Sequence, residues 1–230
     1  MNLFHPRLLK AAGAIAILLS SASAGPLEET FARMDRAATG FKGVKADLAH
    51  VHHTAVLNED DPESGSFVMK RAKANDIRVL FDITKPDPKQ YAFDGHQLEE
   101  YLPRAQTVQI YEAGKYKSLV EEFMLLGFGT TSKELLAHYQ VLFGGPESIE
   151  NEKATRLELI PKSPDLAAHL TRVELWISDT LGVPVQQKFY QQGGDYNRFT
   201  YTSLMINPNI SDSAVKPNYP KGVKREYPLK

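Results

Sequence analysis

The stretch Ser64–Ala72 reads SGSFVMKRA, and its alternation of side chains is typical of a β-strand. Successive side chains of a strand point to opposite faces, so Phe67, Met69 and Arg71 share one face. Two bulky apolar side chains therefore lie beside a guanidinium, a group that is almost never fully buried unless it is paired. The stretch predicts a sheet with an apolar face on which Arg71 must find a partner.

The same period of two continues on both sides of this stretch. Before it, alternation from Phe41 toward Val56 predicts a strand, and the composition of NEDDPESG (58–65) predicts the turn between the two. After it we expect strands at 77–83 and 107–112, with a hairpin around Asp94-Gly95 between them. The pattern resumes later in RLELIP (156–161), RVELWIS (172–178), PVQQKFYQ (184–191) and NRFTYTSLMIN (197–207), with VKREY (223–227) as a possible edge strand.

Helical periodicity occurs in two places. PLEETFARMDRAATGF (26–41) carries Leu27, Phe31 and Met34 on one narrow apolar stripe. In the middle of the chain, residues 118–129 predict a short helix. Residues 130–145 predict a longer one, which begins at Thr131 or Ser132 and is stopped by Gly144-Gly145.

Residues 1–24 are typical of a secretory signal peptide. A basic start is followed by about ten apolar residues and then by SASA, with small residues before the expected cleavage site after Ala24. The apolar stretch is shorter than the roughly 18–20 residues of a membrane span. We therefore expect a mature chain of residues 25–230 that forms a single domain, exported and soluble in the periplasm.

Composition excludes several classes of function. Without Arg7 and Lys10 the chain keeps 25 basic and 28 acidic residues, a balance that argues against a general nucleic-acid binder. The chain has no cysteine. This excludes disulfides, thiolate zinc sites, a cysteine nucleophile and lipidation on a cysteine, so stability must come from a packed core.

These patterns predict a mainly β fold with some α (α+β). We expect a curved antiparallel sheet that forms an unclosed β-barrel, with helices as a lid over its concave apolar face. Periodicity alone leaves open whether the enclosed space is a solid core or a cavity.

Several short motifs resemble the outer-membrane lipoprotein carrier family, the LolA type. Between residues 64 and 103 the matching positions are Gly65, Lys70-Arg71, Arg78, Asp94-Gly95, Leu98, Tyr101 and Pro103. The segments FKGVKADLAH (41–50), RLELIPKSPD (156–165) and DYNRFTYTSLMINPNI (195–210) are also similar to segments of that family. The chain departs from the family pattern at Ala72, where the family has proline.

The resemblance implies a periplasmic monomer that binds lipoprotein acyl chains or another lipid and moves them from an inner-membrane releasing transporter to an outer-membrane acceptor. It also implies that Arg71 reaches from the sheet to the backbone of a lid helix and closes the empty cavity; a strand-end arginine whose stem covers apolar surface is the alternative. The residues expected to line the cavity are Phe31, Met34, Phe67, Met69, Val79, Phe81, Tyr91, Phe93, Leu135, Leu136, Tyr139, Leu142, Leu157, Leu159, Val173, Leu175 and Ile177.

Other functions find less support in the sequence. HVHH places His50 and His52 on one strand face and adds His53, but no carboxylate completes a recognised metal-site spacing, so we expect no metal and no cofactor. Neither G-x-S-x-G nor H-E-x-x-H occurs, and we expect no enzyme. The alternative to a carrier is an envelope-stress sensor or regulatory module on the same scaffold, which would usually carry a second domain after the half-barrel.

Overall fold

The computed structural model describes residues 25–73, 76–112, 114 and 126–228. The predicted signal peptide, residues 1–24, lies outside the described residues. The helices are α1 (Pro26–Ala38), α3 (Ser132–His138) and α4 (Pro164–Ala167), with 3₁₀ turns η1 (Pro103–Ala105), η3 (Gln192–Gly194) and η4 (Asp212–Val215). The strands are β1 (Gly43–Thr54), β2 (Glu59–Lys73), β3 (Asp76–Lys85), β4 (Lys89–Phe93), β5 (Gln97–Leu102), β6 (Thr107–Glu112), β7 (Tyr139–Ile149), β8 (Glu152–Pro161), β9 (Arg172–Ser178), β10 (Pro184–Tyr190), β11 (Tyr196–Ile206) and β12 (Lys224–Glu226).

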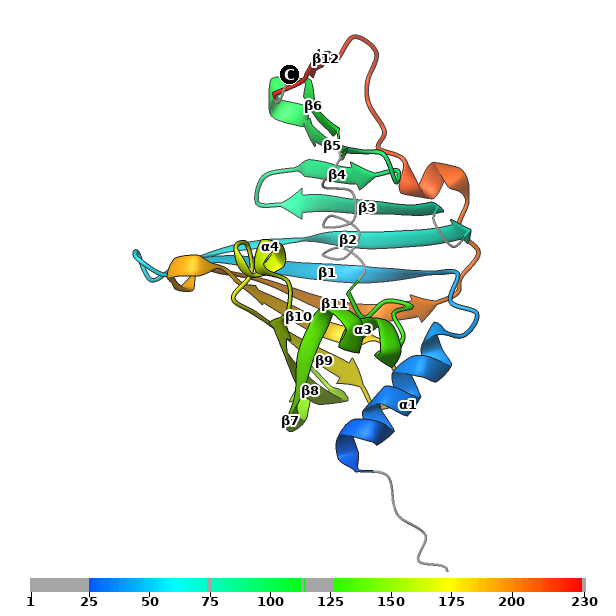
Figure 1. Cartoon of the computed structure of the whole chain (residues 1–230). Coiled ribbons are helices and arrows are strands. Elements are labelled where there is room, and N and C mark those ends of the chain that lie inside the picture. The colour runs from blue at the N-terminus through cyan, green and yellow to red at the C-terminus, as the bar shows by residue number, and fades with distance from the viewer. Residues whose placement is uncertain (1–24, 74–75, 113, 115–125, 229–230) are drawn as a thin grey trace, which may run out of the picture.

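The twelve strands of the described residues form one sheet in the order β12-β6-β5-β4-β3-β2-β1-β11-β10-β9-β8-β7 (Figure 1). Neighbouring strands are antiparallel, apart from the short β12, which pairs in parallel with β6. Because β7 and β12 remain as edges, the sheet is an unclosed barrel, and the predicted fold class is confirmed.

Strand register gathers the apolar side chains on one face. Phe67 of β2 lies opposite Ala46 of β1 and Phe81 of β3, and Leu157 of β8 lies opposite Leu175 of β9. Paired residues of neighbouring strands point to the same side of a sheet. The alternation read from the sequence therefore continues across the whole curved surface.

Two apolar clusters occupy this concave face. One lies over β1, β2 and β3 and includes Phe67, Met69 and Val79, with Phe128 from the loop before α3 packed against it. The other lies over β8, β9 and β10, where Met34 of α1 and Leu135 of α3 pack on the sheet. The helices thus cover one part of the concave face, as the stripe of α1 predicted.

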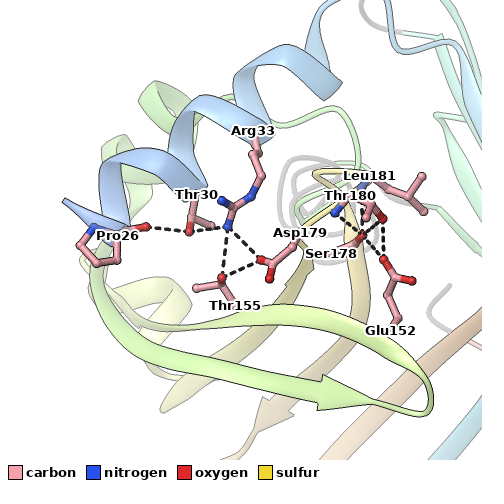
Figure 2. A network of polar contacts seen from close by, with 9 residues as sticks. All are labelled: Pro26, Thr30, Arg33, Glu152, Thr155, Ser178, Asp179, Thr180 and Leu181. Atoms are coloured by element: carbon pink, nitrogen blue, oxygen red, sulfur yellow. Dashed lines mark hydrogen bonds and ion pairs between the residues drawn. The ribbon is translucent and has the colours of Figure 1, made fainter. Parts of the chain in front are cut away.

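Polar contacts fix α1 to the sheet (Figure 2). The Nη2 atom of Arg33 donates hydrogen bonds to Thr155 Oγ1 at 3.1 Å and to the carboxylate of Asp179 at 3.0 Å. At the same end, Glu152 accepts hydrogen bonds from the hydroxyls of Ser178 and Thr180, both at 2.6 Å. The Arg33–Asp179 bond holds the β9–β10 turn against the helix, and the bonds to Glu152 hold the same turn against the start of β8.

The predicted turn at residues 58–65 is wrong. The chain turns at residues 55–58, and β2 already begins at Glu59. Two acidic residues explain the difference, because Asp60 and Glu63 face histidines of β1 and bond to them across the ladder. Their composition predicted a turn, whereas cross-strand pairing places them in a strand.

The long helix predicted for residues 130–145 is also wrong in its second half. Thr131 caps α3 through a capping box with Glu134, but the helix ends at His138 and β7 follows. Backbone bonding to β8 overrides the helical spacing of the side chains. Of the short helix predicted for residues 118–129, residues 118–125 lie outside the described part of the chain and 126–129 form a turn.

Candidate functional site

Part of the concave face is not filled by the helices. A cavity of about 670 Å³ lies over the central strands, within the range of small-molecule sites. It is lined by Leu48, His50, His52, Asp61, Pro62, Glu63, Phe81, Ile83, Pro86, Asp87, Lys89, Tyr91, Leu98, Gln187, Phe189, Asn197, Phe199 and Tyr201. Most of these residues belong to β1–β5, β10 and β11, so the cavity is a continuation of the apolar face.

Aromatic rings form much of the cavity wall. Phe199 lies at the centre, with its ring centroid 5.9 Å from that of Phe189 and 6.0 Å from that of Phe81. The imidazole of His50 stacks on Phe199 at 4.5 Å. Rings at these separations make favourable offset or edge contacts and leave a rigid apolar surface.

A short chain of hydrogen bonds closes one side of the wall. The hydroxyl of Tyr201 donates to Gln187 Oε1 at 2.7 Å, and Gln187 Nε2 donates to the carbonyl oxygen of Leu126 at 2.5 Å. Burial raises the pKa of Tyr201, which stays a neutral donor. The loop before α3 is thereby tied to the two strands that bound the cavity.

A charged and polar network lies at the other end. Glu63 accepts from Lys89 at 2.5 Å and bonds to His50 Nδ1 at 3.0 Å, while His50 Nε2 faces Asn197 Oδ1 at 3.0 Å. Burial opposes the ionisation of Glu63, but hydrogen bonds from Lys89 and His50 outweigh it and lower the pKa of the carboxyl. Burial likewise opposes the charge of Lys89, yet the bond to Glu63 raises its pKa. The pair is therefore ionised inside the cavity.

Tyr91 forms the wall between the apolar surface and this network. Burial and the charge of Glu100 raise the pKa of Tyr91 to about 12. The ammonium of Lys89 lies 5.7 Å from the centroid of the Tyr91 ring. The cavity thus joins an apolar surface to an end that carries fixed charges.

The structure separates the residues that the sequence predicted as cavity lining. Phe81 and Tyr91 border the cavity. Leu136 and Leu142 do not, because 41% and 44% of their surfaces are exposed on the outside of α3 and β7. The remaining residues pack into the two core clusters or against them: Phe31, Met34, Phe67, Met69, Val79, Phe93, Leu135, Tyr139, Leu157, Leu159, Val173, Leu175 and Ile177.

This distribution corrects one expectation in particular. Leu175 is fully buried beneath the helices, so it belongs to the core and not to the cavity wall. The lid helices and the loop before α3 fill the space over that part of the sheet. A face that reads as one continuous apolar surface in the sequence is divided by packing into a solid part and a hollow part.

Sequence reasoning missed most of the wall. Leu48, Phe189, Phe199 and Tyr201 line the cavity because β1 pairs with β11 and β11 with β10. The sequence predicted the strands that carry these residues. It did not indicate that β1, near the N-terminus, would lie beside β11, near the C-terminus.

Arg71 contacts the loop that precedes α3. Its Nη1 donates to the carbonyl oxygen of Gly129 at 3.3 Å, and its guanidinium lies 5.8 Å from the ring centroid of Phe41. The resemblance implied a partner in the backbone of a lid helix, where the helix dipole could attract the guanidinium. Gly129 instead comes before the N-cap Thr131, so the dipole of α3 does not attract the guanidinium there.

The three histidines of HVHH do not converge on one point. His50 and His52 both face Asn197 Oδ1, and His53 pairs with Asp60 at 2.7 Å on the other side of the sheet. In the described part of the chain, no group of three or more His, Asp or Glu side chains could hold a metal ion. None of the helices among the described residues is both long enough and apolar enough to cross a membrane.

Comparison with known proteins bears on the fold. No protein-family sequence model matches the chain, and no curated protein matches it in sequence. An uncharacterised conserved protein from Thermus thermophilus superposes with a TM-score of 0.54 at 12% identity over 88% of this chain and 99% of that one. MucB superposes with a TM-score of 0.51 at 11% identity over 83% of this chain. The fold is shared.

A third solved structure is a putative outer membrane lipoprotein-sorting protein domain from Vibrio parahaemolyticus. That domain matches 80% of this chain at 12% identity with a TM-score of 0.44, and 94% of it is covered. The chain spans 62% of the length of MucB. The superpositions with TM-scores above 0.5 show that the chain shares its fold with MucB and the Thermus thermophilus protein.

Proposed function

We propose that the protein is a periplasmic carrier that binds the acyl chains of lipoproteins, or another lipid, in the cavity and shuttles them from the inner to the outer membrane. The observation that carries this proposal is the cavity of about 670 Å³ on the apolar concave face. Each buried methylene stabilises a bound acyl chain by about 0.8 kcal/mol, so an apolar wall of this kind retains a lipid against water.

A carrier of this kind needs no chemical step in the cavity. The polar groups there, Glu63, Lys89, His50 and Asn197, bond to one another, an arrangement suited to holding a ligand. The partners that fit this role are a releasing transporter at the inner membrane and an acceptor at the outer membrane. The motifs between residues 64 and 103 that resemble the lipoprotein carrier family support the assignment.

The direct test is to identify lipids that purify with the protein and to measure binding of N-phenyl-1-naphthylamine, a neutral apolar fluorophore. We expect one site per chain, from which added lipid displaces the fluorophore. Leu98→Glu places a charge in the wall and should weaken binding at least about tenfold. Leu181→Glu makes the same change on an exposed turn and should bind like the parent.

Transfer distinguishes a carrier from a protein that only stores or senses a lipid. The protein should move a fluorescent lipid from donor to acceptor vesicles faster than spontaneous exchange, and Leu98→Glu should not. Binding without transfer would contradict shuttling. Absence of any bound lipid or fluorophore would favour the alternative, a regulatory module that binds a protein partner on the same scaffold.

A further inference from the structure

The cavity has two chemically distinct ends. Phe81 and Leu98 belong to its apolar end, whereas Glu63 and Lys89 belong to its polar end, and Phe199 lies between them, stacked on His50. The side chains of this ion pair are only 15% and 22% exposed, so both charges are partly removed from water. A ligand that is apolar throughout would desolvate these charges without giving them a new partner. Such desolvation costs binding free energy.

Among the described lining residues, the carboxylates of Asp61, Glu63 and Asp87 outnumber the single lysine. The one lysine among the described lining residues, Lys89, already bonds to Glu63, and Asp87 is paired with Arg104. Asp61 also lines the cavity, is exposed to solvent and lies opposite His52 in the β1–β2 ladder. The end therefore presents carboxylate oxygens and, within the described part of the chain, lacks a free cation.

We propose that the cavity selects amphiphiles by headgroup and prefers one that donates hydrogen bonds and carries positive charge over a free acid of the same chain length. This inference rests on the proposed function and names the ligand class of the same site. An ammonium headgroup would donate to the carboxylates of Glu63 and Asp61 while its alkyl chain lies on the Phe81 and Phe199 rings. The ring of Tyr91 adds a surface on which a cation is favoured.

A carboxylate headgroup is disfavoured at the polar end. To bind at this end it would have to compete with Glu63 for Lys89, and it would lie close to the charge of Asp61. Like charges at short range inside a partly enclosed site repel one another more strongly than in bulk water. An alcohol, which is neutral and can donate one hydrogen bond, should fall between the amine and the acid.

The test uses dodecylamine, dodecanol and dodecanoic acid, which share one chain length, as competitors of N-phenyl-1-naphthylamine at pH 7 and below the concentrations at which they aggregate. We expect the amine to bind about tenfold more tightly than the acid, with the alcohol between them. An acid that binds as tightly as the amine, or more tightly, would overturn the inference.

Two variants with the same change of charge test whether the headgroup preference comes from Glu63. Glu63→Gln removes the carboxylate and frees Lys89, so the preference for the amine should shrink to less than about threefold. Glu59→Gln removes the same charge from the exposed start of β2, outside the cavity, and should leave the preference unchanged. Equal effects of the two variants would overturn the inference.

The competition experiment also separates this inference from the proposed function. If the fluorophore binds and none of the three competitors displaces it, the proposed function itself fails. Displacement without a headgroup preference overturns the inference alone.

Discussion

Arg71 donates a hydrogen bond to the backbone of Gly129, so that β2 is bonded to the loop in front of α3 across 58 positions of the sequence. The same loop reaches the cavity wall, because Leu126 accepts a hydrogen bond from Gln187. Arg71 does not line the cavity. It holds in place a segment that does contact the wall.

Loss of this bond should alter ligand binding. If the bond favours a closed empty state, the apparent affinity is lowered in proportion to the fraction of molecules that remain open. A hydrogen bond from a charged donor contributes about 1.5–3 kcal/mol, so Arg71→Leu should bind the fluorophore about tenfold or more tightly and transfer lipid more slowly. Binding titration and vesicle transfer measure both effects.

Arg78→Leu is the control for that prediction. Arg78 points to the opposite face of the sheet, where it pairs with Asp76 at 3.0 Å. Its replacement should leave affinity and transfer close to those of the parent. Unchanged binding in Arg71→Leu would mean that Arg71 is a strand-end residue whose aliphatic stem covers apolar surface.

The contact between α1 and the β9–β10 turn requires a glycine. Gly182 has φ +67°, and a Cβ at this position would lie 2.5 Å from the carbonyl oxygen of Arg33. Gly182→Ala should therefore lower the free energy of unfolding by about 1–3 kcal/mol more than Gly193→Ala. Gly193 has a similar φ of +84° but open space around it, so it isolates the steric effect from backbone strain. Equal losses in the free energy of unfolding, measured by chemical denaturation, would show that the positive φ alone accounts for the destabilisation.

Two adjacent leucines of α3 should differ in their contribution to stability. Leu135 is 1% exposed and packs on β8 and β9, whereas Leu136 is 41% exposed. Leu135→Ala should cost about 2–5 kcal/mol and Leu136→Ala about 0.5 kcal/mol or less, as measured by urea unfolding. The reverse order would mean that α3 presents a different face to the sheet.

Acid should remove the stability that Glu63 supplies. The pKa of this carboxyl in the folded state is below its ordinary value of 4.5, so the unfolded chain binds the proton more readily. The contribution is therefore complete above about pH 5.5 and lost as the pH falls through the folded-state pKa. The melting temperature of the parent should exceed that of Glu63→Gln at pH 7, with the difference vanishing at a pH well below the folded-state pKa. A difference that persists there would exclude the ionised carboxylate as its source.

Export should generate a new N-terminus. If residues 1–24 are a signal peptide, mass spectrometry of the protein from a periplasmic extract should find a chain that begins at Gly25. Recovery of the full-length chain from the membrane fraction would contradict this prediction.

The sequence alone determined the class of fold and the apolar face. Alternation around Phe67 and Met69, the Asp94-Gly95 hairpin and the stripe of α1 are local features, and each was confirmed because neighbouring residues decide it. The residue at which α3 ends was not decided by local sequence. Residues 139–143 have helical spacing, yet pairing with β8 makes them strand, since backbone bonding to a neighbouring strand outweighs weak helix propensity.

The location of the cavity was decided only by the tertiary structure. The sequence indicates that Phe81, Leu175 and Phe199 face one side of their strands, and it gives no sign of which will be covered by a helix. Helix docking, fixed by contacts such as Arg33–Asp179, fills the space over Leu175 and leaves Phe81 and Phe199 beside open space. Periodicity reports the direction of a side chain, whereas a cavity depends on what packs opposite it, and that partner comes from distant parts of the chain.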